Sequence, residues 1–177
     1  MTDDALWYEA AHVVGITNAL NVVADALAPA PGQSPLLAPV GEAASEPAVA
    51  ALFTEIRAFY DRRDVPVAFR LVAHDPGYLG DLWGATRHAF SENRLSRRLK
   101  EALAFAVSLT TRSEFGTGFH LAEMRRLGVG ERGVMEVLGV AQMFSSYTKI
   151  ADTLQLESDM AELAPVDESP APGGGSR

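Results

Sequence analysis

The chain has 177 residues, 47% hydrophobic and 21% charged, values typical of one globular domain with a sizeable core and not of a disordered chain. Its formal net charge of -8 disfavours contact with phosphate backbones, so we expect no nucleic-acid partner. It contains no cysteine, which excludes disulfides, thiolate metal sites and thiol redox catalysis and is consistent with a cytoplasmic protein.

The first 27 residues are predicted to form an N-terminal helix. Apolar side chains follow three-and-four spacing from Ala5 to Leu27, and Asp3 and Asp4 stand at the start, where negative charge suits the helix dipole. The acidic start lacks the basic residues of a signal peptide. Because charges interrupt the apolar stretches of the chain, we expect no membrane-spanning segment.

Residues 28–47 are predicted to be a proline-rich loop or arm. Proline cannot continue a helix, and this segment contains five prolines: Pro29, Pro31, Pro35, Pro39 and Pro47. Such an arm could wrap around a neighbouring subunit.

Residues 48–160 are predicted to be a helical domain, and the tail at 161–177, rich in Pro, Gly and Ser, is predicted to be disordered. Start signals stand at Asp75-Pro76, Ser96 and Ser113, and Gly128 is a stop signal. No segment alternates with period two. The sequence therefore predicts an all-α bundle of six or seven helices, with helices at about 5–27, 48–62, 66–73, 76–90, 97–112, 114–127 and 131–156.

Glu101 and His120 are the strongest candidates for chemistry. On the helix that begins at Arg97, Glu101 lies opposite Leu99 and Leu103, so both faces of this helix are expected to contact protein. His120 lies on the apolar stripe of the next helix and would point inward. If the two helices pack as a hairpin, Glu101 and His120 can meet as a general acid/base pair, and the alternative is a structural hydrogen bond in the core.

The other polar candidates have simpler interpretations. Ser113 is more readily a helix cap than a nucleophile. A metal site built from Glu101, His120 and a further histidine is conceivable, but no tight ligand motif is present, so we expect neither a metal nor an organic cofactor.

The basic run from Arg94 to Lys100 is predicted to be a solvated helix start, or to bind a carboxylate substrate or a neighbouring subunit through residues such as Arg97 and Arg98. Three aromatic residues could line an apolar pocket but are expected instead to pack in the core: Trp7, Tyr8 and Tyr147.

Three stretches resemble the core of the alkylhydroperoxidase D/carboxymuconolactone decarboxylase family: RRLKEALAFAVS at 97–108, SEFGTGFH at 113–120 and RRLG at 125–128. The likeness extends over residues 51–156. The resemblance implies an AhpD-like helical bundle and a homo-oligomer, commonly a trimer or hexamer in this family.

The peroxidase branch of that family carries a Glu, then a C-x-x-C motif twelve residues later, then a His four residues after the second Cys. Glu101 and His120 match the Glu and the His, whereas Ser113 and Gly116 stand at the two cysteine positions. Peroxide reduction in that branch is thiolate chemistry, which serine and glycine do not supply. The redox positions are therefore degenerate: the resemblance implies a peroxidase, whereas the residues at these two positions disfavour a thiol peroxidase.

The decarboxylase branch acts on small lactone acids without a metal or an organic cofactor, and likeness to it implies Glu101 and His120 as acid and base. The sequence leaves three functions open. The first is a cofactor-free lyase or isomerase of a small organic acid, and the second is a catalytically inactive ligand-binding or protein-interaction module. The third is a peroxidase-related oxidoreductase that uses a bound metal or cofactor.

Overall fold

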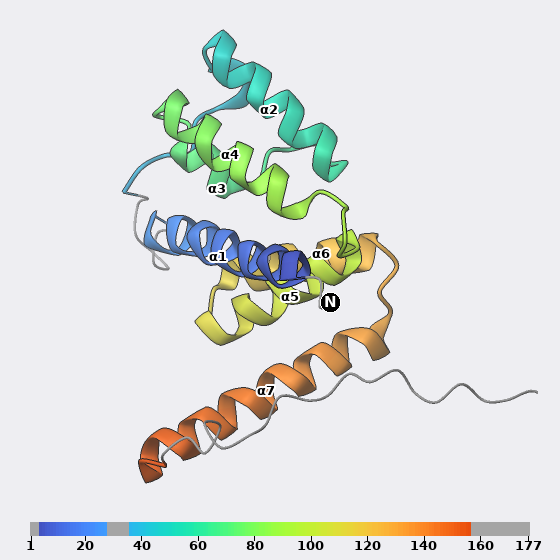
Figure 1. Cartoon of the computed structure of the whole chain (residues 1–177). Helices are drawn as coiled ribbons and strands as arrows, with labels where there is room; N and C mark the ends of the chain where they lie inside the picture. The colour runs from blue at the N-terminus through green and yellow to red at the C-terminus, as the bar shows by residue number, and fades with distance from the viewer. Residues whose placement is uncertain (1–3, 28–35, 157–177) are drawn as a thin grey trace, which may run out of the picture.

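A computed structural model describes residues 4–27 and 36–156 of the chain, and within these ranges it confirms the predicted all-α class (Figure 1). The predicted disordered tail and residues 28–35 of the predicted arm lie outside the described residues. A short 3-10 helix, η1 (Glu42–Ala44), lies between the first and second α-helices. The α-helices are α1 (Asp4–Leu27), α2 (Pro47–Tyr60), α3 (Val67–Val72), α4 (Pro76–Phe90), α5 (Arg97–Thr111), α6 (Glu114–Arg126) and α7 (Glu131–Leu154).

Local signals place the helix ends where the sequence predicts them. The Asp75 carboxylate accepts a hydrogen bond from the Tyr78 backbone N–H at 3.0 Å and opens α4. The Ser96 hydroxyl caps α5 by accepting from Leu99 N–H at 3.3 Å. Gly128 follows α6 with φ +82°, a conformation that glycine adopts without steric cost.

Helix α1 lies between two groups of helices (Figure 1). It packs against α3 and α4 on one side and against α5 and α6 on the other, and α2 covers α4. Figure 1 shows α7 apart from these elements, and α5 is the helix that it contacts most. The buried apolar core is therefore built by α1 to α5, and includes Val13, Leu20, Phe53, Ile56, Phe69, Leu79, Trp83 and Phe90.

The expectation that charges interrupt every long apolar stretch is wrong for α1. Residues 10–24 carry no Asp, Glu, Lys or Arg, and by length and composition alone this one helix of the described chain could cross a membrane. Its side chains Val13, Ile16, Leu20 and Ala24 are instead buried in the protein core. The helix is apolar because it packs against four other helices at once.

A buried ion pair joins α1 to the start of α5. Lys100 is fully buried; its Nζ pairs with the Glu9 carboxylate and donates to the Ser91 carbonyl at 2.5 Å. Burial alone would raise the pKa of the Glu9 carboxyl, but hydrogen bonding and attraction to Lys100 lower it. The expectation of a solvated basic run is therefore wrong for Lys100, and also for the buried Arg97, whereas Arg98 is exposed.

Trp7, Tyr8 and Tyr147 do not belong to the core, contrary to expectation. All three are more than half exposed, on α1 and α7. The aromatic core comes from α2, α3 and α4 instead, where the Phe69 and Trp83 rings pack edge to face with centroids 5.8 Å apart. Periodicity marks an apolar helix face, but whether the same chain covers that face depends on the tertiary arrangement.

Candidate functional site

The Glu101 carboxylate is at the centre of a buried polar cluster between α5 and α6. Its side chain is completely buried. One oxygen, Oε1, accepts from Arg97 Nε at 2.7 Å, one helical turn earlier on α5. The other, Oε2, accepts from His120 Nδ1 on α6, also at 2.7 Å. The helix hairpin thus brings Glu101 and His120 into direct contact, and both carboxylate oxygens are occupied.

His120 is held rigidly by its neighbours. Its ring stacks on Phe90 with a centroid distance of 5.7 Å and an interplanar angle of 9°, and Phe119 approaches it edge to face at 5.2 Å. Because a carboxylate can only accept, Nδ1 carries the hydrogen in the contact with Glu101. The other nitrogen, Nε2, is buried and has no partner among the described residues. A histidine with one nitrogen fixed by a carboxylate and the other free is an arrangement suited to proton transfer.

Arg97 contacts Glu101 of this pair and also lines a depression on the protein surface. Its guanidinium carbon lies 4.3 Å from the Phe59 ring centroid, 5.1 Å from that of Tyr60 and 5.3 Å from that of Phe90. Nη1 donates to the Phe90 carbonyl at 3.4 Å, whereas Nη2 is buried and makes no hydrogen bond within the described chain. Arg97 and the exposed Arg98 both line a surface depression of about 260 Å³, together with Glu92, Ser96 and Leu127.

Two buried polar residues of the same cluster were missed by the sequence analysis. Tyr60 of α2 is fully buried, and its hydroxyl has no partner among the described residues. Burial raises the pKa of Tyr60, and the Glu101 carboxylate raises it further, so the hydroxyl stays protonated. Glu123 is buried on α6, where Arg126 donates to it at 2.7 Å and Arg62 lies 3.5 Å away. The i,i+3 spacing of Glu123 and Arg126 in the sequence is typical of an ion pair on one face of a helix.

Ser113 and Gly116 form a packed helix start. The Ser113 hydroxyl accepts from Gly116 N–H at 3.0 Å and donates to Asp25 of α1 at 3.1 Å. A Cβ at Gly116 would lie 2.1 Å from Asn21 Oδ1 and 2.4 Å from Ser108 Oγ, closer than atoms can approach. Ser113 is therefore a cap, as expected, and Asn21 occupies the space that a side chain at position 116 would need.

The remaining histidines lie elsewhere. The rings of His12 and His88 contact each other with centroids 5.3 Å apart, and His74 bonds to the Ala38 carbonyl at 2.9 Å. Within residues 4–27 and 36–156, no three side chains of His, Cys, Asp or Glu are grouped as a metal ion requires. The third histidine of the conceivable metal site is therefore not beside Glu101 and His120.

Comparison with known proteins identifies this helical arrangement. Residues 77–156 match the model of the carboxymuconolactone decarboxylase family. The fold is similar to the crystal structure of the alkylhydroperoxidase AhpD core from Rhodospirillum rubrum, with a TM-score of 0.68 and 24% sequence identity over 75% of this chain and 99% of that one. No curated protein sequence matches the chain. Residues 77–156 are therefore similar to the carboxymuconolactone decarboxylase family, and the chain has an all-α, AhpD-like fold with serine and glycine at positions 113 and 116.

Proposed function

We propose that the chain is a cofactor-free acid/base enzyme, a lyase or isomerase that acts on a small organic acid in the cytoplasm. The observation that carries this proposal is His120, whose Nδ1 is held by Glu101 while its buried Nε2 is unpartnered in the described structure. In this proposal Nε2 takes up or delivers the proton. Glu101 fixes the orientation and tautomer of the ring, since both of its oxygens are already engaged.

The position of Arg97 supports a carboxylate substrate. Its guanidinium reaches from the surface depression to Glu101 and keeps one buried N–H donor free. A guanidinium among aromatic rings recognises carboxylates well, because it is planar and weakly hydrated. Arg98, exposed at the same depression, would contact the outer part of the substrate. Because the chain has no cysteine, the proposed step uses no thiol.

His120→Asn tests the chemistry with little change to the hydrogen-bond network. The asparagine amide can take the place of Nδ1–H toward Glu101, but nothing replaces Nε2. Small carboxylic and lactone acids would be screened by NMR for exchange of carbon-bound protons with deuterated solvent and for decarboxylation. For a substrate that the parent turns over, we expect the variant to be slower by about 100-fold or more.

His74→Asn, an exposed histidine on the 73–75 turn, is the matched control and should keep the parent rate. A folded His120→Asn variant with an undiminished rate would contradict the proposed role of Nε2. If the parent turns over no acid in the screen, the result favours the inactive ligand-binding or interaction module instead.

A further observation supports a homo-oligomer. Helix α7 exposes large apolar side chains at three-and-four spacing, each more than half exposed: Val140, Met143, Tyr147, Ile150 and Leu154. Among the described residues of α7, only Ala141 is buried. Such a stripe is typical of a helix that packs against more protein than its own chain supplies.

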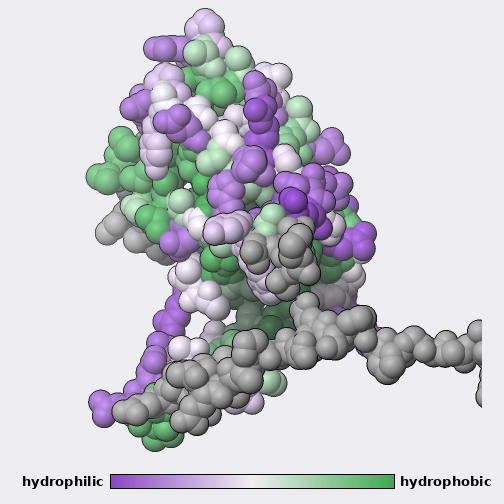
Figure 2. Space-filling view, in the orientation of Figure 1, coloured by the Kyte–Doolittle hydropathy of each residue, from purple (hydrophilic) through white to green (hydrophobic). Residues whose placement is uncertain are grey.

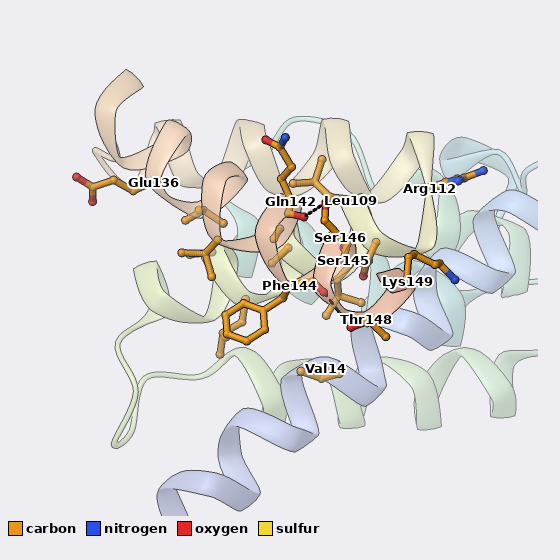
Figure 3. A pocket seen from close by; sticks show the side chains of 18 of the residues that line it. Val14, Leu109, Arg112, Glu136, Gln142, Phe144, Ser145, Ser146, Thr148 and Lys149 are labelled. Atoms are coloured by element: carbon orange, nitrogen blue, oxygen red, sulfur yellow. Dashed lines mark hydrogen bonds between the residues drawn. The ribbon is translucent and has the colours of Figure 1, made fainter. Parts of the chain in front are cut away.

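A groove of about 1260 Å³ is lined by residues of α7 and α5 and by Val14 of α1 (Figure 3), and Figure 2 shows the hollow between α7 and the rest of the chain. Residues 137–148 carry no charged side chain. Glu136 lines one end of the groove, and Arg112 and Lys149 line the other (Figure 3). The groove is thus apolar in the middle and oppositely charged at its ends.

We propose that α7 of a second copy occupies this groove in the antiparallel direction. Centred between Gln142 and Met143, this pairing places Glu136 of each copy level with Lys149 of the other, whereas a parallel pairing would align like charges. The pairing is a two-fold dimer contact. A hexamer can contain it, but a trimer of simple cyclic symmetry cannot.

Light scattering after size-exclusion chromatography tests this pairing. Met143→Glu with Ile150→Glu is expected to give a folded monomer, because both positions are exposed in the single chain. Leu36→Glu, an exposed apolar position outside α7, should keep the parent mass. Glu136→Lys should weaken the assembly, and adding Lys149→Glu should restore it. A monomeric parent would contradict the proposal.

A further inference from the structure

Three buried polar atoms without a hydrogen-bond partner belong to one cluster of touching side chains. They are the Tyr60 hydroxyl, Arg97 Nη2 and His120 Nε2. The only other such atoms in the described chain belong to α1, in Glu9 and Thr17, and that Glu9 oxygen pairs with Lys100. Buried polar groups are almost always hydrogen-bonded, so three exceptions in one place indicate a missing ligand atom or water.

Contacts join the three residues to one another. Arg97 and His120 bind the two oxygens of the same Glu101 carboxylate. The Arg97 guanidinium carbon lies 5.1 Å from the Tyr60 ring centroid. The Phe119 ring packs edge to face on both Tyr60, at 5.1 Å, and His120, at 5.2 Å. The three side chains that carry the unpartnered atoms therefore lie together where α2, α5 and α6 meet.

The free donors of this region favour a ligand with acceptor oxygens. Arg97 is a permanent N–H donor, and the Tyr60 hydroxyl stays protonated because burial and the nearby carboxylates raise its pKa. Each nearby carboxylate already has a cationic partner, because Arg97 pairs with Glu101, and Arg62 and Arg126 pair with Glu123. The free Arg97 N–H and the Tyr60 hydroxyl therefore need an acceptor from outside these pairs, and a charged oxygen is the strongest acceptor for a guanidinium.

We propose that Tyr60, Arg97 and His120 form the binding site for one carboxylate group, with the Tyr60 hydroxyl and Arg97 Nη2 donating to its oxygens. The carboxylate would enter from the surface depression, because Arg97 lines that depression and also contacts Tyr60. His120 Nε2 would then face the carbon skeleton next to the carboxylate. The carboxylate site rests on the proposed function, since it names the group by which the substrate is held. Tyr60 is then a substrate-binding residue.

Acetate is the probe, because it is the smallest carboxylate with a carbon skeleton. Its affinity would be measured from the rise in the thermal unfolding midpoint against sodium chloride at equal ionic strength, and by NMR saturation transfer from the protein to acetate. We expect saturable binding by the parent. Tyr60→Phe removes one hydrogen bond to a charged group, so the affinity for acetate should fall about 10-fold or more.

Tyr78→Phe is the matched control, since this tyrosine on α4 is about half exposed and lies outside the cluster; acetate affinity should stay at the parent value. Without acetate, Tyr60→Phe should unfold at the parent midpoint or above it, because it deletes a buried hydroxyl that lacks a partner. A clearly lower midpoint would mean that the hydroxyl holds a structural water, and would overturn the inference.

The carboxylate site would also be contradicted if the parent and Tyr60→Phe bound acetate with equal affinity. The same holds if acetate raised the unfolding midpoint of the parent no more than sodium chloride does. The two proposals can fail separately. Acetate binding without turnover of any acid leaves the carboxylate site in place and contradicts the enzyme proposal. Turnover that depends on His120 but is unaffected by Tyr60→Phe leaves the enzyme proposal in place and contradicts this site.

Discussion

Glu101→Gln is expected to lower the free energy of unfolding by about 3–5 kcal/mol, because it leaves the buried Arg97 guanidinium without its counter-ion. The substitution also forces a change at His120, whose Nδ1 donates to the carboxylate in the parent. An amide can accept from one of these donors but presents its own N–H₂ to the other. Chemical denaturation measures the loss.

A double-mutant cycle with Arg97→Met separates the ion pair from other effects. Removing both charges takes away the unpaired guanidinium, so the double variant should be more stable than the sum of the single losses predicts, by about 1–3 kcal/mol. Asp81→Asn, an exposed charge-to-amide change on α4, is the control and should stay within about 0.5 kcal/mol of the parent. Parent-like stability of Glu101→Gln would show that the carboxylate is not the counter-ion of Arg97.

The stability of Glu101→Gln does not distinguish a catalytic Glu101 from a structural one. Because Glu101 has two partners, its loss is expected to weaken the fold whether or not the site is catalytic. His120→Asn and Tyr60→Phe are therefore the variants that separate chemistry from structure. Each removes a polar atom that has no hydrogen-bond partner in the described structure, so neither breaks a hydrogen bond there. His120→Asn also loses the packing of the ring against Phe90, so its stability is measured beside its rate.

Gly116→Ala is the second substitution with a large expected effect. An added Cβ would overlap Asn21 Oδ1 and Ser108 Oγ, so we expect a loss of about 1–3 kcal/mol, as in other overpacked cores. Gly118→Ala, two residues later on the same helix, meets nothing within 4 Å. It should instead stabilise the protein by about 0.5–1 kcal/mol, since alanine is the better helix former.

The contact with α1 can be tested by a compensating change. Asn21→Ala in the Gly116→Ala background removes the nearest overlap and should recover part of the loss, whereas the contact with Ser108 remains. Thermal and chemical denaturation of the single and double variants would show this coupling. Additive losses would mean that Asn21 does not fill the space beside position 116. The same overlap predicts that cysteines placed at 113 and 116 together would be poorly accommodated while Asn21 is present.

The order and ends of the helices could be predicted because they depend on local chemistry. Asp75, Ser96 and Ser113 each accept from the backbone N–H three residues later, and Gly128 takes a positive φ. These interactions involve neighbours in the chain, so the sequence alone shows them. The contact of Glu101 with His120 was foreseeable for a related reason, since consecutive helices joined by a tight turn pack side by side.

The sequence by itself determined the all-α class, the helix boundaries and the inward-facing Glu101 and His120, because periodicity and capping are properties of short segments. Only the tertiary structure decided the polar surroundings of that pair. Arg97 and Lys100 look solvated in sequence, but aromatic rings from α2 and α4 enclose one, and Glu9 of α1 pairs with the other. Nothing in the local sequence marks the unpartnered hydroxyl of Tyr60 or the close approach of Asn21 to Gly116. Their significance depends on neighbours far away in the chain, which local sequence patterns do not reveal.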